Sequence, residues 1–247
     1  LRADALSERL AAICRDGHGS ARFAIAPEQT EREWIAWHDS IGRRVDRLRA
    51  RRRKPAPTPL VSVCIVHHDR PTLLRRALRS IERQSYPRIE VVLVDDGSRR
   101  PESVRMLQRL EPGFRNRGWR IVRQANRYLG AARNEAARHA RGKYLLFMDD
   151  DNVAKRHEVA TFVTAAEATG ADVLTCLQDG FASRTAPRSD ADVDFRALFL
   201  GGATAAGVLR NAYGDANSLV RRASFEAIGG FTEDYGLGFE DWEFFAK

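Results

Sequence analysis

The sequence contains few cysteines and no long apolar run. Cys14, Cys64 and Cys176 are odd in number, far apart and without CxxC spacing, which argues against a disulfide framework or a zinc site. No stretch approaches the roughly 18–20 apolar residues of a membrane span, and no signal peptide is recognisable. These absences favour a reducing compartment, so we expect a cytoplasmic protein.

Glycine-rich phosphate-binding fingerprints are also missing. Neither the G-x-G-x-x-G pattern nor the P-loop pattern occurs in the 247 residues, although both would mark a loop that cradles phosphate. This absence argues against a dinucleotide-dependent dehydrogenase and against a P-loop ATPase. Any diphosphate ligand would then need its charge balanced by a metal or by basic side chains.

The excess of positive charge is confined to one segment. The net charge is +8, but eight basic residues between Arg43 and Lys54 are opposed there only by Asp46. Because the rest of the chain is nearly balanced, we expect no nucleic-acid partner. The basic segment suits a solvated helix C-terminus, and contact with the inner face of an anionic membrane or with nucleic acid is the alternative.

Prolines mark the domain boundary. Apolar residues before position 54 recur at helical spacing, whereas Pro55, Pro57 and Pro59 favour an extended linker. We therefore expect a helical N-terminal appendage over 1–54, a linker over 55–59 and one large domain over 60–247. The first residue is Leu1 and the pattern stops at Lys247, so we expect further domains of the same polypeptide.

Strands and helices alternate along the large domain. This alternation predicts an α/β fold with a mostly parallel central sheet flanked by helices and joined by right-handed crossovers. Residues 178–214 show weaker periodicity and are predicted to form loops. The predicted strands are 60–66, 89–94, 119–123, 144–148, 172–177 and 216–220, and the predicted helices are 73–81, 101–110, 130–140, 155–168, 221–228 and 239–245.

Two acidic clusters follow predicted strands. Asp95 and Asp96 end the second strand, and Asp149, Asp150 and Asp151 end the fourth. The carboxyl ends of parallel strands share one edge, so the clusters can converge on one ligand. Carboxylates held together repel unless a cation compensates, and their hard oxygens favour Mg²⁺ or Mn²⁺. A solvated acidic loop or a helix N-cap would explain the triplet equally well.

The ordered motifs resemble family 2 glycosyltransferases with the GT-A fold, over roughly residues 60–245. They are Val61-Ser62-Val63-Cys64-Ile65, Val91-Val92-Leu93-Val94-Asp95-Asp96-Gly97-Ser98, Asn126-x-x-x-Gly130-Ala131-Ala132-Arg133-Asn134, Gly142-Lys143-Tyr144-Leu145-Leu146-Phe147-Met148-Asp149-Asp150-Asp151, Gly229-Gly230-Phe231 and Phe239-Glu240-Asp241. The resemblance implies a nucleotide-sugar-binding half over 60–152 and an acceptor-side half over 153–247.

The resemblance also implies roles on the donor side. Asp96 would bind the nucleotide base, Asp95 would support the same pocket, and Arg133 would lie near base or phosphate. Asp149 and Asp151 match the D-x-D motif, with Asp151 as the direct metal ligand and Asp149 facing ribose or metal. The middle residue, Asp150, would point away.

On the acceptor side, Asp241 matches the catalytic base of inverting members, and Glu240 would hydrogen-bond the acceptor or a loop. Alone, Asp241 would be read as a helix N-terminal residue favoured by the dipole. The sequence departs from the family pattern at His67 and His68, where an aromatic residue near the base is usual. His68 can still stack on a base, so the departure affects nucleotide preference, and metal binding by the two histidines is a minor alternative.

These roles predict a metal-dependent, inverting glycosyltransferase that uses Mn²⁺ or Mg²⁺ and a nucleotide-sugar donor, a UDP-sugar first. The acceptor would be a carbohydrate, a lipid-linked sugar or a protein, as in polysaccharide biosynthesis. A sugar nucleotidyltransferase is one alternative, but the segment from His67 to Arg70 is not the glycine-rich basic loop expected of it. A non-catalytic nucleotide-sugar-binding module is the other.

Overall fold

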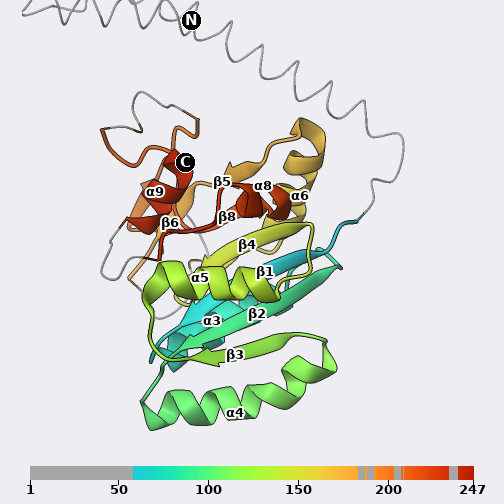
Figure 1. Cartoon of the computed structure of the whole chain (residues 1–247), viewed down its shortest axis with the longest axis vertical. Helices are drawn as coiled ribbons and strands as arrows, with labels where there is room; N and C mark the ends of the chain where they lie inside the picture. Colours follow the sequence, from blue (N-terminus) through green and yellow to red (C-terminus); the bar gives the residue numbers. More distant parts are fainter. Residues whose placement is uncertain (1–57, 183–186, 188–191, 203–206, 208, 234–238) are drawn as a thin grey trace, which may run out of the picture. The chain divides into compact units, whose positions relative to one another are not determined.

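The computed structural model describes residues 58–182, 187, 192–202, 207, 209–233 and 239–247 (Figure 1). The predicted appendage over 1–54 and most of the predicted linker over 55–59 lie outside these residues, as does the basic segment.

A six-stranded sheet forms the centre of the described domain, in the order β3-β2-β1-β4-β8-β5 (Figure 1). The first four of these strands are mutually parallel, whereas β8 runs antiparallel to both of its neighbours. The expected fold class, a GT-A-type α/β domain with a mostly parallel sheet, is confirmed. The strands are β1 (Val61–His67), β2 (Ile89–Asp96), β3 (Arg120–Gln124), β4 (Tyr144–Asp149), β5 (Val173–Thr175) and β8 (Ser218–Arg221).

Helices cover both faces of the sheet. On one face, α3 (Pro71–Glu82), α4 (Pro101–Asn116) and α6 (Glu158–Thr169) pack against alternate residues of β1, β2 and β4. On the other face, α5 (Tyr128–His139), α8 (Arg222–Ala227) and α9 (Glu240–Ala246) pack against the intervening residues. Because both faces are covered, β1 is buried along its whole length, which explains its unbroken apolar sequence.

Two segments differ from the sequence prediction. The helix α4 continues to Asn116, past the predicted end at 110, even though Pro112 lies inside it. A proline removes one helical hydrogen bond, but Phe114, only 4% exposed, packs into the core and holds the last turn. In the predicted loop region, β6 (Gln178–Gly180) and β7 (Phe195–Ala197) form a separate antiparallel pair.

Among the residues that the structure describes, no helix is long and apolar enough to cross a bilayer.

Candidate active site

The acidic side chains lie at the carboxyl edge of the sheet, where β1, β2 and β4 end together. In the register of these strands, His67 of β1 is opposite Asp95 of β2, and Val66 of β1 is opposite Asp149 of β4. Asp95 also closes the turn after β2, because its Oδ1 accepts a hydrogen bond from the backbone N of Ser98 at 3.2 Å. The two acidic clusters therefore flank the end of one strand, at the edge where open α/β sheets bind ligands.

Asp96 is buried and acts as an acceptor for the turn that leads into α5. Its Oδ1 accepts hydrogen bonds from Gln124 Nε2 at 2.7 Å and from the backbone N of Arg127 at 2.9 Å. Its Oδ2 accepts one from the backbone N of Tyr128 at 3.0 Å. The carboxylate thus fixes the shape of this loop, and its contact with a nucleotide base, which the family resemblance implies, stays a prediction.

A pocket of about 400 Å³ opens beside Asp96. Because a carbonyl oxygen can only accept, Nδ1 of His68 donates to the backbone O of Asp96 at 2.8 Å, which fixes the tautomer of a ring that is 47% exposed. Gly97 has a φ of +78°, and a Cβ on it would lie 2.7 Å from the backbone N of Asn126, so only glycine fits this turn. The pocket is lined by His68, Gly97, Arg99, Asn126 and Tyr128.

The three consecutive carboxylates after β4 have different surroundings. Asp150 is fully buried between His67, whose Nδ1 lies 2.7 Å from Oδ2, and Arg70, whose Nη2 lies 2.5 Å from Oδ1. Asp149 and Asp151 are 28% and 42% exposed. Burial raises the pKa of Asp151, Arg70 at 2.8 Å opposes this shift, and the two neighbouring carboxylates add to it. The middle carboxylate is therefore structural, and the outer two are open to a ligand.

Two of these carboxylates fit a divalent cation. Asp149 pairs with Arg133 through one oxygen and Asp151 pairs with Arg70 through one oxygen, and carboxylate oxygens are the donors that Mg²⁺ and Mn²⁺ prefer. In the described ranges, no three His, Cys, Asp or Glu side chains are grouped as a metal cage. Mg²⁺ is commonly held by one or two carboxylates together with substrate phosphates, so a metal held by this pair is compatible with the side chains present and stays a prediction.

Arg133 connects the end of β4 to α9. It is 2% exposed, and its Nη2 lies 2.8 Å from Asp149 Oδ1 while its Nη1 lies 2.5 Å from Glu240 Oε1. The guanidinium also lies over the ring of Phe231, 5.4 Å from its centroid. Burial opposes its charge, but the two carboxylates outweigh it and raise the pKa of Arg133. Both terminal nitrogens are engaged by protein, so contact with base or phosphate stays a prediction.

Asp241 lies in the first turn of α9 and is partly buried. Its Oδ1 accepts a hydrogen bond from the backbone N of Trp242 at 2.7 Å, and its Oδ2 lies 3.4 Å from Asn211 Nδ2. Burial is the main effect that raises the pKa of Asp241, and the negative charges of Glu240 and Asp215 add to it. A carboxylate with a raised pKa is a stronger base.

Sequence reasoning missed three side chains of this site. His67 is predicted only as a minor metal ligand, yet it is buried against Asp150, while the next residue, His68, lines the pocket. Arg70 precedes the helix-starting Pro71 and gave no signal of its pairing with Asp150 and Asp151. Asn211 comes from a loop without periodicity, so only the structure brings it to Asp241.

Known proteins resemble this chain in sequence. The family model described as glycosyl transferase family 2 matches residues 62–229. EpsH of Bacillus subtilis, whose name describes it as a glycosyltransferase, is 31% identical over 97 residues, which are 38% of this chain and 27% of EpsH. The O-antigen biosynthesis protein RfbC of Myxococcus xanthus is 38% identical over 96 residues, which are 38% of this chain and 7% of RfbC.

Solved structures share the fold. S. aureus TarS 1–349 in complex with UDP has a TM-score of 0.58 and 21% identity, over 75% of this chain and 54% of that one. The mannosyltransferase PcManGT from Pyrobaculum calidifontis, in complex with GDP-Man and Mn²⁺, has a TM-score of 0.57 and 22% identity, over 85% of this chain and 61% of that one.

The chain thus spans less than two thirds of the length of each of these proteins. The family match nevertheless covers more than half of the chain, from the first strand of the sheet to the end of α8. The chain therefore belongs to glycosyl transferase family 2.

Proposed function

We propose that this domain transfers a sugar from a nucleotide-sugar donor, a UDP-sugar first, to an acceptor hydroxyl with inversion at the anomeric carbon. One observation carries the proposal: a pocket, a pair of open carboxylates and a carboxylate of raised pKa lie around one sheet edge. Arg133 links the last two through Asp149 and Glu240. The complexes of TarS with UDP and UDP-GlcNAc, and of PcManGT with GDP-Man and Mn²⁺, support a nucleotide-sugar donor.

The donor would lie across the ends of β1, β2 and β4. The base enters the pocket beside His68 and Tyr128, where the imidazole can stack on it. The backbone around this pocket is held by Asp96, so Asp96 acts through the loop shape as well as through any direct contact with the base. The diphosphate then reaches Asp149 and Asp151 at the end of β4.

A divalent cation, Mn²⁺ or Mg²⁺, held by Asp151 and Asp149 would neutralise the charge that develops on the leaving diphosphate. Arg70, 46% exposed and paired with Asp151, lies beside the same group.

The acceptor oxygen attacks the anomeric carbon as the bond from that carbon to the diphosphate oxygen breaks. The bonding electron pair leaves with the nucleoside diphosphate, and the hydroxyl proton passes to the carboxylate of Asp241. No covalent enzyme intermediate is required. Glu240 is bound to Arg133. This ion pair holds the first turn of α9 and so sets the position of Asp241, the proposed catalytic base.

The acceptor would be a carbohydrate, a lipid-linked sugar or a protein. The name of RfbC, an O-antigen biosynthesis protein, favours a carbohydrate or lipid-linked acceptor and a role in polysaccharide biosynthesis.

A thermal-shift screen of nucleotides and nucleotide sugars, with and without Mn²⁺, tests the donor assignment. A ligand that binds only the folded state raises the midpoint of unfolding. We expect UDP and a UDP-sugar to raise it only in the presence of Mn²⁺, and the Asp151→Ala variant to lose this response. A chain that responds to no nucleotide under either condition would contradict the proposal.

A further inference from the structure

The outer side of α3 carries a stripe of three arginines. Arg75, Arg79 and Arg83 are spaced four residues apart along α3 and its C-cap, and all three are exposed. Four residues advance about 6 Å along a helix, so the stripe extends for roughly 12 Å. Like charges at this spacing repel and destabilise the helix. The stripe therefore needs an explanation outside helix stability.

No carboxylate in the described part of the chain pairs with these arginines. The first turn of α3 contains no acidic residue, and its single acid, Glu82, is engaged by Arg117. The helix α4 also has one acid engaged elsewhere, Glu111 by Arg123, but it differs from α3 in carrying a further exposed acid, Glu102, in its first turn. Glu82 lies on the same face of α3, but Arg117 neutralises it, so this face keeps a net positive charge that is available to an anionic partner.

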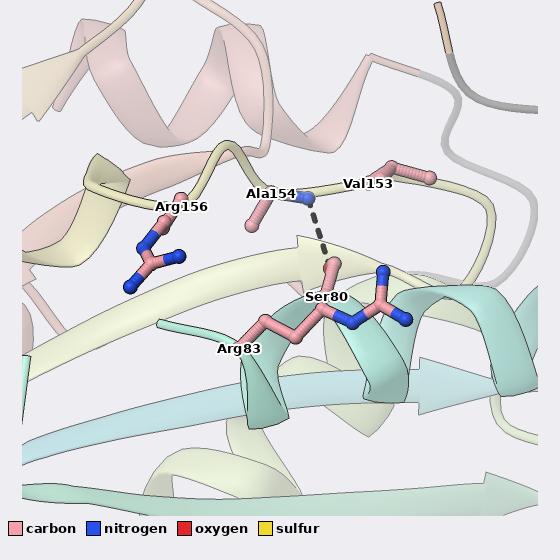
Figure 2. A pocket seen from close by; sticks show the side chains of 5 residues that line it. All are labelled: Ser80, Arg83, Val153, Ala154 and Arg156. Carbon is pink, nitrogen blue, oxygen red and sulfur yellow. Dashed lines mark hydrogen bonds between the residues drawn. The ribbon is translucent and has the colours of Figure 1, made fainter. Parts of the chain in front are cut away.

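A groove of about 580 Å³ lies next to the C-terminal end of the stripe (Figure 2). The hydroxyl of Ser80 donates to the backbone O of Ala77 and accepts from the backbone N of Ala154 at 3.0 Å, so it is already satisfied. In the view of Figure 2, the guanidinium groups of Arg83 and Arg156 lie on either side of this second hydrogen bond. The groove is lined by Ser80, Arg83, Val153, Ala154 and Arg156.

We propose that the arginine stripe of α3 and the adjoining groove form a docking surface for anionic lipid headgroups. Guanidinium groups bind phosphate oxygens in pairs of parallel hydrogen bonds, and a row of them suits a plane of many phosphates. Val153, which is partly exposed, supplies apolar contact for the glycerol part of a headgroup. Nucleic acid fits less well, since none of the five groove residues is an aromatic side chain on which a base could stack.

Vesicle binding by the full chain tests the proposal. Vesicles of phosphatidylcholine with about 30% phosphatidylglycerol are compared with pure phosphatidylcholine at about 0.1 M salt, where surface charge is only partly screened. The variant Arg75→Gln/Arg79→Gln/Arg83→Gln is compared with a control on α4, Arg105→Gln/Arg109→Gln/Arg115→Gln. Both variants lose three exposed charges from a helix, and glutamine keeps helix propensity near that of arginine.

Each arginine near an anionic surface increases the affinity for that surface roughly fivefold. Because the α3 variant lacks three arginines, it should bind the anionic vesicles about 100-fold more weakly than wild type. Adding Arg156→Gln should weaken binding by roughly another fivefold. The α4 control should stay within about threefold of wild type, because distant charges act only through the screened field. Circular dichroism and the thermal midpoint verify that each variant is folded.

Three results would overturn the proposal. Wild type could bind anionic and neutral vesicles equally. The α3 and α4 variants could lose affinity for the anionic vesicles by the same factor, which would show that vesicle binding depends on the net charge of the chain and not on the stripe. The α3 variant could instead lose affinity for a short DNA duplex while wild type ignores the vesicles, which would make the partner a soluble polyanion.

Discussion

Replacing Arg133 by methionine should disturb stability and catalysis together. The change leaves Asp149 and Glu240 without their shared cation, and these side chains are only 28% and 12% exposed. Removing one partner of a buried ion pair costs about 3–5 kcal/mol, and partial exposure of the two carboxylates favours the lower end. For a domain of this size, about 3 kcal/mol corresponds to a fall of roughly 6–12 °C in the midpoint of thermal unfolding.

The catalytic loss should exceed what unfolding explains. In the folded Arg133→Met variant, α9 would lose the ion pairs that connect it to β4 through residue 133. The catalytic carboxylate on α9 could then shift, and a displacement of about 1 Å at a reacting group can lower the rate on the order of 100-fold. We expect this loss in kcat, measured as nucleoside diphosphate release at a temperature where the variant is folded. Arg133→Lys should recover part of the stability, since a lysine keeps the charge but not the two-sided fork.

Arg138→Met provides the matched control on the same helix. Arg138 is 51% exposed and pairs with Glu135, and a surface ion pair contributes only about 0–1 kcal/mol. A double-mutant cycle of Arg133→Met with Glu240→Gln should give a coupling of roughly 1–3 kcal/mol. If Arg133→Met melts like the Arg138→Met control and keeps wild-type kcat, the linking role of Arg133 is refuted.

Three further changes test other parts of the structure. Asp241→Asn should abolish transfer. Burial raises the pKa of Asp241 above its ordinary 3.8, so the ionised carboxylate opposes folding and the variant should be more stable than wild type at pH 7. In chemical denaturation this gain in stability should vanish below pH 3.8. Gly97→Val should weaken UDP binding by at least about tenfold in calorimetry, because the new Cβ would meet the backbone N of Asn126. The control variant Gly113→Ala, whose new Cβ would enter open space, should bind UDP like wild type. Glu90→Gln should destabilise the fold by about 1–3 kcal/mol at neutral pH. Hydrogen bonds from Ser62 and Arg141 outweigh burial and lower the pKa of Glu90. The stability that the Glu90 carboxylate contributes is therefore present above its ordinary pKa of 4.5 and should disappear as the pH falls through the lowered pKa.

The centre of the sheet could be predicted from the sequence because β1, β2 and β4 are buried on both faces. A mostly apolar run such as Val61–Val66 is not expected in a strand with one solvated face or in a solvated loop. Each run therefore marks a buried strand, and the order of the runs in the sequence gives the order of these strands along the chain. The direction of β8 could not be predicted, because the connection from β5 crosses residues without periodicity. The antiparallel pair of β6 and β7 has three residues in each strand, too few for an alternation to mark it.

The acidic residues of the site could be found from their place after strands, but their partners could not. Arg133 and Glu240 are separated by 107 positions, and their pairing depends on how α9 packs against the sheet. The same holds for His67 and Asp150, which are 83 positions apart. Local patterns identify which residues end a strand, whereas the tertiary fold decides which charges neutralise each other.

The most direct test of the proposed function is the release of UDP from a UDP-sugar, followed with and without Mn²⁺. We expect wild type to release UDP only with Mn²⁺ and faster when an acceptor sugar is added. Asp151→Ala should lose release altogether, while Asp241→Asn should still bind UDP but lose the acceleration by acceptor. Acceptor-stimulated release at the wild-type rate by both variants would contradict the account of this site.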